Sequence, residues 1–301
     1  MKIAGVVILY NPSKDVVSNI NSYLPFINRL YVVDNSENSA LSILQDISID
    51  EKVIYIHDGE NKGIAERLNQ VVEIALAEGF ERMLTMDQDS FFTQENITAY
   101  LNCVNKFNLS EKVGIFGVEF ENKLNISNNC ESEETDQLIT SGSILNLKLC
   151  KEIGKFDEAL FIDEVDLEFC YRLISSNYKV IKFSNVTLNH QLGHIYFGRS
   201  LKSFKKTPRT LHSPARVYYM VRNYLYVKKK YAGKFIESDK SRRKALLTRL
   251  KNNLLYSNNK LGVLRYIIKG ISDFYLNNMG RLNKKSLRNQ DKKEKNTKWK
   301  T

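Results

Sequence analysis

The first ninety residues repeat one pattern, an apolar run followed by a polar turn, and this pattern constrains the fold more than any other feature. Each run is apolar almost throughout, as expected of strands buried on both faces of a parallel sheet. The runs lie at residues 2–10, 29–33, 53–56 and 82–86. Helical spacing of apolar residues is found at residues 16–24 and 64–78 and begins again at Thr93. The alternation predicts a doubly wound α/β fold with a mainly parallel sheet flanked by helices.

Polar residues stand at the ends of these four predicted strands. They are Tyr10-Asn11, Asp34-Asn35, Asn61-Lys62-Gly63 and Asp87-Gln88-Asp89. In open α/β sheets the ligand binds beyond the carboxyl ends of the strands. The four clusters together therefore predict a binding site along one edge of the sheet.

The chain becomes less regular after these repeats and then helical. Residues 113–120 and 178–183 predict two more strands, and residues 122–136 are typical of a polar loop. Three helical patterns follow, at residues 215–231, 242–256 and 261–276. In the last of them, six apolar residues share one stripe: Leu264, Ile267, Ile268, Ile271, Phe274 and Tyr275.

Charge divides the chain into two unequal parts. Residues 1–195 contain 16 Lys and Arg against 29 Asp and Glu, a net of −13, whereas residues 196–301 contain 29 against 5, a net of +24. We expect an acidic α/β domain at residues 1–195, a basic helical region at 196–283 and a disordered Lys-rich tail at 284–301. A basic surface of this kind suits lipid headgroups or nucleic acid.

Neither membrane spans nor disulfides are expected. No apolar segment approaches the roughly 18 residues of a transmembrane helix. The short apolar run at the N-terminus lacks a small-residue cleavage site, so we interpret it as the first strand rather than a signal peptide. The four cysteines are far apart in the sequence, and reduced thiols in a cytosolic protein are the expectation: Cys103, Cys130, Cys150 and Cys170.

Asp87 and Asp89 are the strongest candidates for a metal site. Alternation along an extended chain directs both carboxylates to the same side. Two hard oxygen ligands suit Mg²⁺ or Mn²⁺, with water and a diphosphate completing the coordination. A bare Asp-X-Asp is also compatible with a solvated turn, but its position after a buried strand favours the metal.

Asp34 and Lys62 are candidates for contacts to a nucleotide. A carboxylate at the Asp34 position can accept a hydrogen bond from a base or a ribose, although an Asx-turn is the alternative. Lys62 and Gly63 precede a helix, whose N-terminus can meet a phosphate. The chain has no Gly-X-Gly-X-X-Gly and no Walker-type lysine, which argues against dinucleotide enzymes and ATPases.

Four acids lie within six residues at Asp163, Glu164, Asp166 and Glu168. Some of them are expected on a solvated helix face. A sugar hydroxyl has a very high pKa and requires a positioned base when it attacks, so one of these acids is a candidate base. His190 and His194 follow, and each is a candidate ligand or a loop or packed histidine.

These residues together resemble the inverting family 2 glycosyltransferases of the GT-A fold, in particular the bacterial rhamnosyltransferases. The resemblance covers about residues 3–230. The Asp34 and Asp87–Asp89 motifs mark only the wider superfamily. The segments that point to rhamnosyl transfer are 161–172 and Tyr218-Tyr219-X-X-Arg222-Asn223.

The resemblance implies roles for individual residues. Donor contacts would come from Tyr10, Asn11, Asp34, Asn35, Lys62, Gly63, Gln88, His190, Arg222 and, through a divalent cation, Asp87. Metal ligands would be Asp87, Asp89 and His190. The base would be Asp163 or Glu164; the wider superfamily places it at Glu164, and we favour Asp163. Acceptor contacts are expected at Ser141, Gly142 and Asp166.

The expected reaction is transfer of L-rhamnose from dTDP-L-rhamnose to a lipid-linked surface-polysaccharide precursor, with Mg²⁺ or Mn²⁺ as cofactor. A UDP-hexose donor is the alternative. The basic helices would then lie on the anionic inner face of the cell membrane; packing on the core or a homodimer are the other uses open to them. A sugar nucleotidyltransferase would need a Gly-rich basic loop where Asn11-Pro12-Ser13 stands. A nucleic-acid partner would leave the acidic clusters unexplained.

Overall fold

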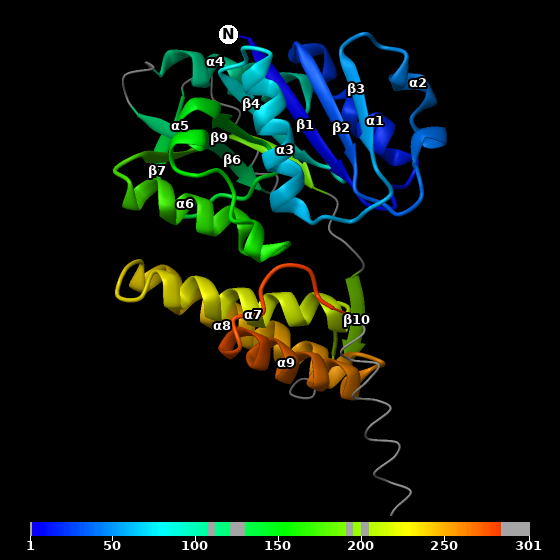
Figure 1. Ribbon diagram of the computed structural model, residues 1–301, viewed down its shortest axis with the longest axis vertical. Helices are drawn as coiled ribbons and strands as arrows, with labels where there is room; N and C mark the ends of the chain where they lie inside the picture. The colour runs from blue at the N-terminus through cyan, green and yellow to red at the C-terminus, as the bar shows by residue number, and fades with distance from the viewer. Residues whose placement is uncertain (1, 108–111, 121–129, 191–194, 200–204, 284–301) are drawn as a thin grey trace, which may run out of the picture.

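A computed structural model describes residues 2–107, 112–120, 130–190, 195–199 and 205–283 (Figure 1). The strands are β1 (Ile3–Leu9), β2 (Arg29–Asp34), β3 (Val53–His57), β4 (Arg82–Asp87), β5 (Ser90–Phe91), β6 (Val113–Phe120), β7 (Ser132–Glu134), β8 (Ser143–Asn146), β9 (Lys179–His190), β10 (Ile195–Arg199) and β11 (Lys206–Thr210). The α-helices are α1 (Asp15–Asn21), α2 (Gln45–Ser48), α3 (Ile64–Ala77), α4 (Gln94–Lys106), α5 (Leu147–Glu152), α6 (Val165–Ser175), α7 (Pro214–Lys230), α8 (Ile236–Tyr256) and α9 (Lys260–Tyr275). The 3-10 helices among the described residues are η1 (Leu24–Phe26), η2 (Leu41–Ile43) and η4 (Glu158–Leu160).

One mixed sheet forms the centre of the α/β region, in the order β3-β2-β1-β4-β8-β6-β9-β5, with β7 paired to β9. β1 to β4 run parallel to one another, and β9 runs parallel to β6. β8 is antiparallel to both of its neighbours. The prediction of a mainly parallel sheet flanked by helices is confirmed.

The parallel register brings the polar strand ends to one edge of the sheet, as predicted. Leu9 lies opposite Asp34, and Asp34 lies opposite His57. On the other side of β1, Ile8 lies opposite Asp87. The residues that follow these strands therefore start from the same edge.

Two hydrophobic clusters cover the two faces of this sheet. Val7 and Leu9 belong to the cluster under α1 and α4, whereas Ala4 and Val6 belong to the cluster under α3, α5 and α6. Successive side chains of a strand point to opposite faces, so the continuous apolar run of β1 supplies both clusters.

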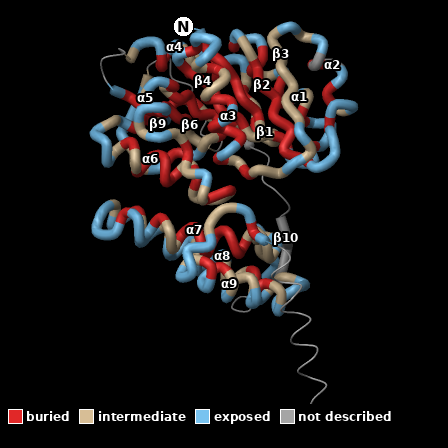
Figure 2. Tube along the Cα trace, in the orientation of Figure 1, coloured by how far each residue is buried: buried red, intermediate tan, exposed pale blue. Residues whose placement is uncertain are grey.

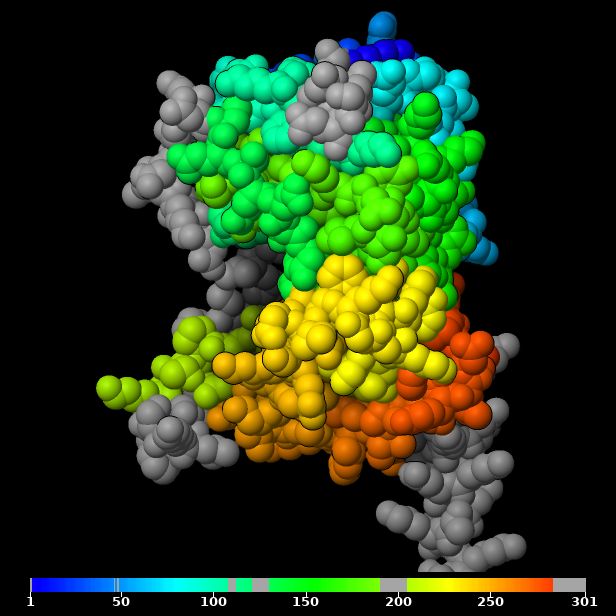
Figure 3. Space-filling model, turned by 90° about the vertical axis from the view of Figure 1, so that its left-hand side faces the viewer, coloured from blue at the N-terminus to red at the C-terminus, as the bar shows by residue number. Residues whose placement is uncertain are grey.

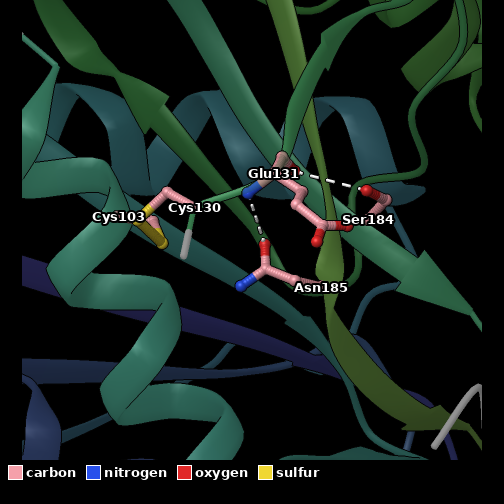
Figure 4. Close-up of a disulfide and its surroundings, with 5 residues drawn as sticks. All are labelled: Cys103, Cys130, Glu131, Ser184 and Asn185. Atoms are coloured by element: carbon pink, nitrogen blue, oxygen red, sulfur yellow. Dashed lines mark hydrogen bonds between the residues drawn. A yellow bond between two sulfur atoms is a disulfide. The ribbon is translucent and has the colours of Figure 1, made fainter. Parts of the chain in front are cut away.

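The expectation of reduced thiols is wrong for one pair of cysteines. Cys103 of α4 and Cys130, just before β7, form a disulfide with 5.4 Å between their Cα atoms (Figure 4). The next residue, Glu131, donates its N–H to Asn185 of β9 at 3.1 Å, which fixes Cys130 beside β9. Because α4 packs against β9, residues 27 positions apart in the sequence meet here. Cys150 and Cys170 are buried and free.

The helices α7, α8 and α9 form a layer beneath the α/β region (Figures 1 and 2). α7 is largely buried, because it lies between the α/β region and the other two helices of the lower layer. Figure 3 shows the C-terminal helices directly against the α/β region. The hairpin of β10 and β11 was not predicted from the sequence; it precedes α7. Across the described ranges, no helix has both the length and the apolar character to cross a bilayer.

Only a small part of the apolar stripe predicted on α9 packs against α7. Val263 and partly buried Ile267 contact α7, where Gly270 allows a close approach to the Tyr218 carbonyl. Leu264 and Ile268 are 45% and 59% exposed. Most of the predicted stripe thus faces away from α7.

Candidate active site

Asp87 and Asp89 lie in the turn between β4 and β5. β4 is buried from Arg82 to Met86, and Asp87 at its end is half-buried. The backbone N–H of Asp87 donates to Ser141 Oγ at 3.1 Å. Gln88 accepts the Tyr10 N–H through Oε1 at 2.8 Å, and its carbonyl accepts from Asn19 at 2.9 Å. Three neighbouring segments therefore fix the turn that carries the two carboxylates.

His190 reaches the same place from a distant part of the sequence. β5 pairs with β9 so that Ser90 lies opposite His190. The backbone of His190 therefore lies beside Ser90, the residue that follows Asp89. The role of the His190 side chain as a metal ligand stays a prediction. His194 lies outside the described residues.

The donor set at the β4–β5 turn fits Mg²⁺ or Mn²⁺. Asp87 and Asp89 are both half-buried. Among the residues that the structure describes, no cluster of three or more His, Cys, Asp or Glu is arranged to hold a metal. Mg²⁺ is commonly held by one or two carboxylates, with water and substrate phosphates completing the shell. The two aspartates match that mode.

Asp34 is buried and forms an Asx-turn at the same edge. Its carboxylate accepts hydrogen bonds from the Ser36 N–H at 3.0 Å, the Ala40 N–H at 2.7 Å and the Tyr55 hydroxyl at 2.6 Å. Burial alone would raise the pKa of Asp34, but these hydrogen bonds hold it below its ordinary value. The alternative of an Asx-turn is therefore realised here, and a contact to the nucleotide stays a prediction.

Tyr10 and Asn11 begin the loop after β1 at this edge. Tyr10 is exposed. Asn11 has a φ of 46° and donates its N–H to Ser36 Oγ at 2.7 Å. This bond ties the loop after β1 to the loop after β2.

Asn35 connects the loops after β2 and β3. Its Nδ2 donates to Asn61 at 3.0 Å, and its Oδ1 accepts from the Lys62 N–H at 2.8 Å and from Arg67 Nε at 3.1 Å. Arg67, which the sequence analysis did not single out, is buried and paired with Asp58 at 2.5 Å. Lys62 Nζ lies 2.8 Å from the same Asp58 carboxylate, which raises the pKa of Lys62. Asn35 thus positions the Lys62 loop from the interior.

Gly63 joins this edge to the segment of acids. It has a φ of 83°, and a Cβ added to it would lie 2.5 Å from the carbonyl oxygen of Phe161. The next residue, Ile64, donates its N–H to that carbonyl at 2.7 Å. The helix α3 therefore begins in direct contact with the chain that carries Asp163 and Glu164.

Residues 161–164, which we name the acid turn, have an unusual backbone. Phe161, Asp163 and Glu164 have φ values of 63°, 65° and 66°. Residues other than glycine seldom adopt such angles, and they do so where the surroundings enforce them. The acid turn directs Asp163 and Glu164 toward different helices of the lower layer.

The two carboxylates of the acid turn have separate arginine partners. Asp163 Oδ2 lies 2.6 Å from Arg216 Nε of α7, and Glu164 forms an ion pair with Arg242 of α8. The Arg216 side chain is 42% exposed, whereas that of Arg242 is 10% exposed. Burial raises the pKa of Glu164 to about 7, against the effect of Arg242 and with help from the Asp166 charge. Burial also raises the pKa of Asp166.

None of the four clustered acids is fully exposed: Asp163, Glu164 and Asp166 are half-buried, and Glu168 is buried. Glu168 has no exposed surface and pairs with Arg172 at 2.7 Å and with Lys230 at 2.9 Å. It also accepts a hydrogen bond from Tyr231 at 2.9 Å. Glu168 therefore anchors α6 to α7.

Three further predicted site residues lie in the interior. Ser141 and Gly142, expected at the acceptor, are buried, and Ser141 instead fixes Asp87. Arg222, expected at the donor, has no exposed surface and donates to the Tyr218 hydroxyl at 3.0 Å and the Gly280 carbonyl at 2.7 Å. Ligand contacts by these residues stay predictions.

Known proteins resemble this chain in sequence and in fold. The family model described as "Glycosyl transferase family 2" matches residues 6–139. The dTDP-rhamnosyl transferase RfbF of Shigella flexneri is 29% identical over 247 residues, which cover 73% of this chain and 78% of that protein.

Two solved structures share the fold at low sequence identity. GalNAc-T7 with UDP, GalNAc and Mn²⁺ has a TM-score of 0.59 at 9% identity, over 92% of this chain. The match spans only 57% of the GalNAc-T7 chain. S. aureus TarS 1–349 with UDP-GlcNAc has a TM-score of 0.55 at 17% identity, over 91% of this chain and 80% of TarS. At such identities the likeness extends to the GT-A fold alone.

Proposed function

Because this chain is a family 2 glycosyltransferase of the GT-A fold, we propose that it transfers L-rhamnose from dTDP-L-rhamnose to a lipid-linked polysaccharide precursor, with inversion at the anomeric carbon. The observation that carries the proposal is that two acidic groups border the same edge of the sheet. Asp87 and Asp89 stand at the carboxyl edge of the sheet, and Gly63 at that edge contacts the acid turn. The name of the S. flexneri relative supports rhamnose as the sugar.

The chemistry follows from these residues. A carboxylate of the acid turn accepts the proton of the acceptor hydroxyl while that oxygen attacks the anomeric carbon. The bond between this carbon and the diphosphate breaks on the opposite side, and the nucleoside diphosphate leaves. Mg²⁺ or Mn²⁺ held by Asp87 and Asp89 would offset the charge on the leaving group.

We favour Asp163 as the base. Its partner Arg216 is more exposed than Arg242, the partner of Glu164, so releasing Asp163 requires less rearrangement of buried charge. Asp163→Asn should then lower kcat by about 10²- to 10⁴-fold, and Glu164→Gln should lower it less. The reverse order would transfer the role to Glu164.

The donor and the metal are tested together by ligand-induced stabilisation. With Mg²⁺ or Mn²⁺, dTDP-L-rhamnose at about 100 times its Kd should raise the free energy of unfolding by about 3 kcal/mol. Asp89→Asn should abolish both this stabilisation and transfer. Asp50→Asn is the matched control, since Asp50 precedes β3 and so lies at the opposite end of that strand.

Each claim has its own contrary outcome. Wild-type turnover of Asp89→Asn in Mg²⁺ would contradict the metal site. Stabilisation by a UDP-hexose but not by dTDP-L-rhamnose would contradict the proposed donor. The assignment as a glycosyltransferase would remain.

We further propose that α9 lies on the anionic inner face of the cell membrane, where a lipid-linked acceptor is found. Exposed apolar residues follow one another at intervals of three and four along α9: Leu261, Leu264, Ile268, Ile271 and Tyr275. Such spacing forms a single stripe, and exposed Lys260 and Arg265 accompany it. α9 lies far from the sheet (Figure 1), so this stripe is open to a surface. An amphipathic helix with basic residues binds in the plane of an anionic bilayer.

A further inference from the structure

The acid turn is held by one face of α7. Tyr219, Arg222, Asn223, Tyr226 and Lys230 recur at helical intervals, and each contacts the segment 157–168. The Tyr219 ring stacks on Phe161 with 5.2 Å between centroids. Tyr226 and Lys230 each reach the Asp157 carboxylate at 2.8 Å.

Asn223 is at the centre of this face and has no exposed surface. Its Nδ2 lies 2.7 Å from the Leu160 carbonyl, 2.7 Å from the Ile162 carbonyl and 3.1 Å from the Asp163 carbonyl. The two N–H groups of this one amide are thus shared among three carbonyls on both sides of the positive-φ residue Phe161, including the carbonyl of a candidate base.

Arg222 fixes Asn223 in turn. Its Nε donates to Asn223 Oδ1 at 2.9 Å. This bond orients the amide so that Nδ2 faces the turn. The guanidinium is itself held by the Tyr218 hydroxyl, which donates to Asp273 of α9 at 2.8 Å. The orientation of Asn223 therefore depends on all of these contacts in the helical layer.

We propose that Asn223 is a positioning residue, whose side-chain amide holds the acid turn so that its carboxylate faces the acceptor hydroxyl. The inference rests on the proposed function, since it takes the base to lie at Asp163 or Glu164. A backbone that would otherwise avoid positive φ needs such an external hold. Asn223 touches no reacting atom and acts through the acid.

The sharpest variant is Asn223→Asp. It preserves the shape and the acceptor for Arg222, but a carboxylate cannot donate to the three carbonyls. We expect kcat to fall by about 10- to 100-fold, as for a displaced reacting group. The donor KM should change by less than about threefold, because the donor contacts proposed above come mainly from the loops after β1 to β4 and not from the acid turn. Asn223→Ser, which keeps one donor, should lose less and provides a second variant should the aspartate impair folding.

A double-mutant cycle separates positioning from general stability. In the background that lacks the base, Asp163→Asn or Glu164→Gln, the substitution Asn223→Asp should have little further effect on kcat. An equal fold-reduction in that background would overturn the inference, as would wild-type kcat for both Asn223 variants. The control is Asn185→Asp: Asn185 is equally an interior asparagine but accepts a hydrogen bond beside the disulfide (Figure 4), so kcat should be unchanged.

Hydrogen exchange keeps this inference separate from the proposed function. Amides of residues 159–164 should exchange faster in Asn223→Asp than in Asn185→Asp, whichever residue is the base. Asp163→Asn and Glu164→Gln could both keep full turnover while exchange is faster in Asn223→Asp. The assignment of the base would then fail, but the role of Asn223 in holding the acid turn would remain. Unchanged exchange would overturn the hold itself.

Discussion

Glu164 differs from an ordinary glutamate because burial stabilises its neutral form. Its pKa of about 7 means that, between roughly pH 4.5 and 7, the folded protein binds a proton that the unfolded chain has released. The free energy of unfolding contributed by this group therefore falls as the pH rises through that window and is constant above it.

Glu164→Gln should remove this pH dependence. The free energy of unfolding of the variant relative to the wild type should increase by up to about 3 kcal/mol between pH 4.5 and 7.5. Urea unfolding at several pH values measures the difference. A difference that is constant over this range would show that burial does not raise the pKa of Glu164.

Sequence patterns predict site residues that depend on local structure and miss those that depend on distant partners. Asp87 and Asp89 could be placed because they lie at and just after the end of a buried strand, and Asp34 because it ends another. Arg242 could not be recognised as the ion-pair partner of Glu164. It is one of several basic residues in α8, and Glu164 lies 78 positions away. Asn223 belongs to a motif that the sequence does show, but its contact with the acid turn spans about 60 positions and could not be inferred from that motif.

At the scale of elements, the contact between the start of α3 and the acid turn depends on Gly63. Gly63→Ala would add a Cβ 2.5 Å from the Phe161 carbonyl at a φ of 83°. We expect a loss of about 1–3 kcal/mol of stability and weaker donor binding, because Lys62 precedes this residue. Thermal unfolding and donor titration measure the two effects.

Gly79→Ala is the matched control for this substitution. Gly79 has a φ of 77° at the end of α3, but an added Cβ would meet nothing within 4 Å. The Gly79→Ala variant should lose about 1–2 kcal/mol of stability, because an alanine is strained at this backbone angle. It should bind the donor as the wild type does. Weaker donor binding by both variants would attribute the effect to α3 as a whole rather than to the acid turn.

Elements with strong periodicity were predictable, and those formed by tertiary contacts were not. β6 was predicted at residues 113–120, where it is observed, and α3 was predicted to within one residue of its observed end. The β10–β11 hairpin was not predictable because its second strand, Lys206–Thr210, has no apolar run. The positions of that strand are exposed or half-buried, and none is buried. The Cys103–Cys130 disulfide depends on the packing of α4 on β9, which spacing along the chain does not reveal.

For the whole molecule, the charge asymmetry and the apolar stripe of α9 together predict a defined orientation at a membrane. The stripe would enter the interface while the α/β region stays above it with its substrate edge accessible. Binding should require anionic lipid and weaken with salt, because each nearby basic residue contributes about 1 kcal/mol through the surface potential. The helices would then position the enzyme where its acceptor is held.

Replacing Leu264 and Ile268 together by serine tests this orientation. Both are exposed, so the fold should be retained, and loss of their apolar surface should weaken flotation with anionic liposomes by at least about tenfold. Ile49→Ser is the matched control, because Ile49 is 84% exposed but lies in the α/β region. Equal flotation of the double variant and the wild type would contradict membrane binding by α9. A dimer in solution that the double variant abolishes would assign the stripe to a second copy of the chain instead, since an unpaired apolar helix face is stabilised equally well by a matching protein surface.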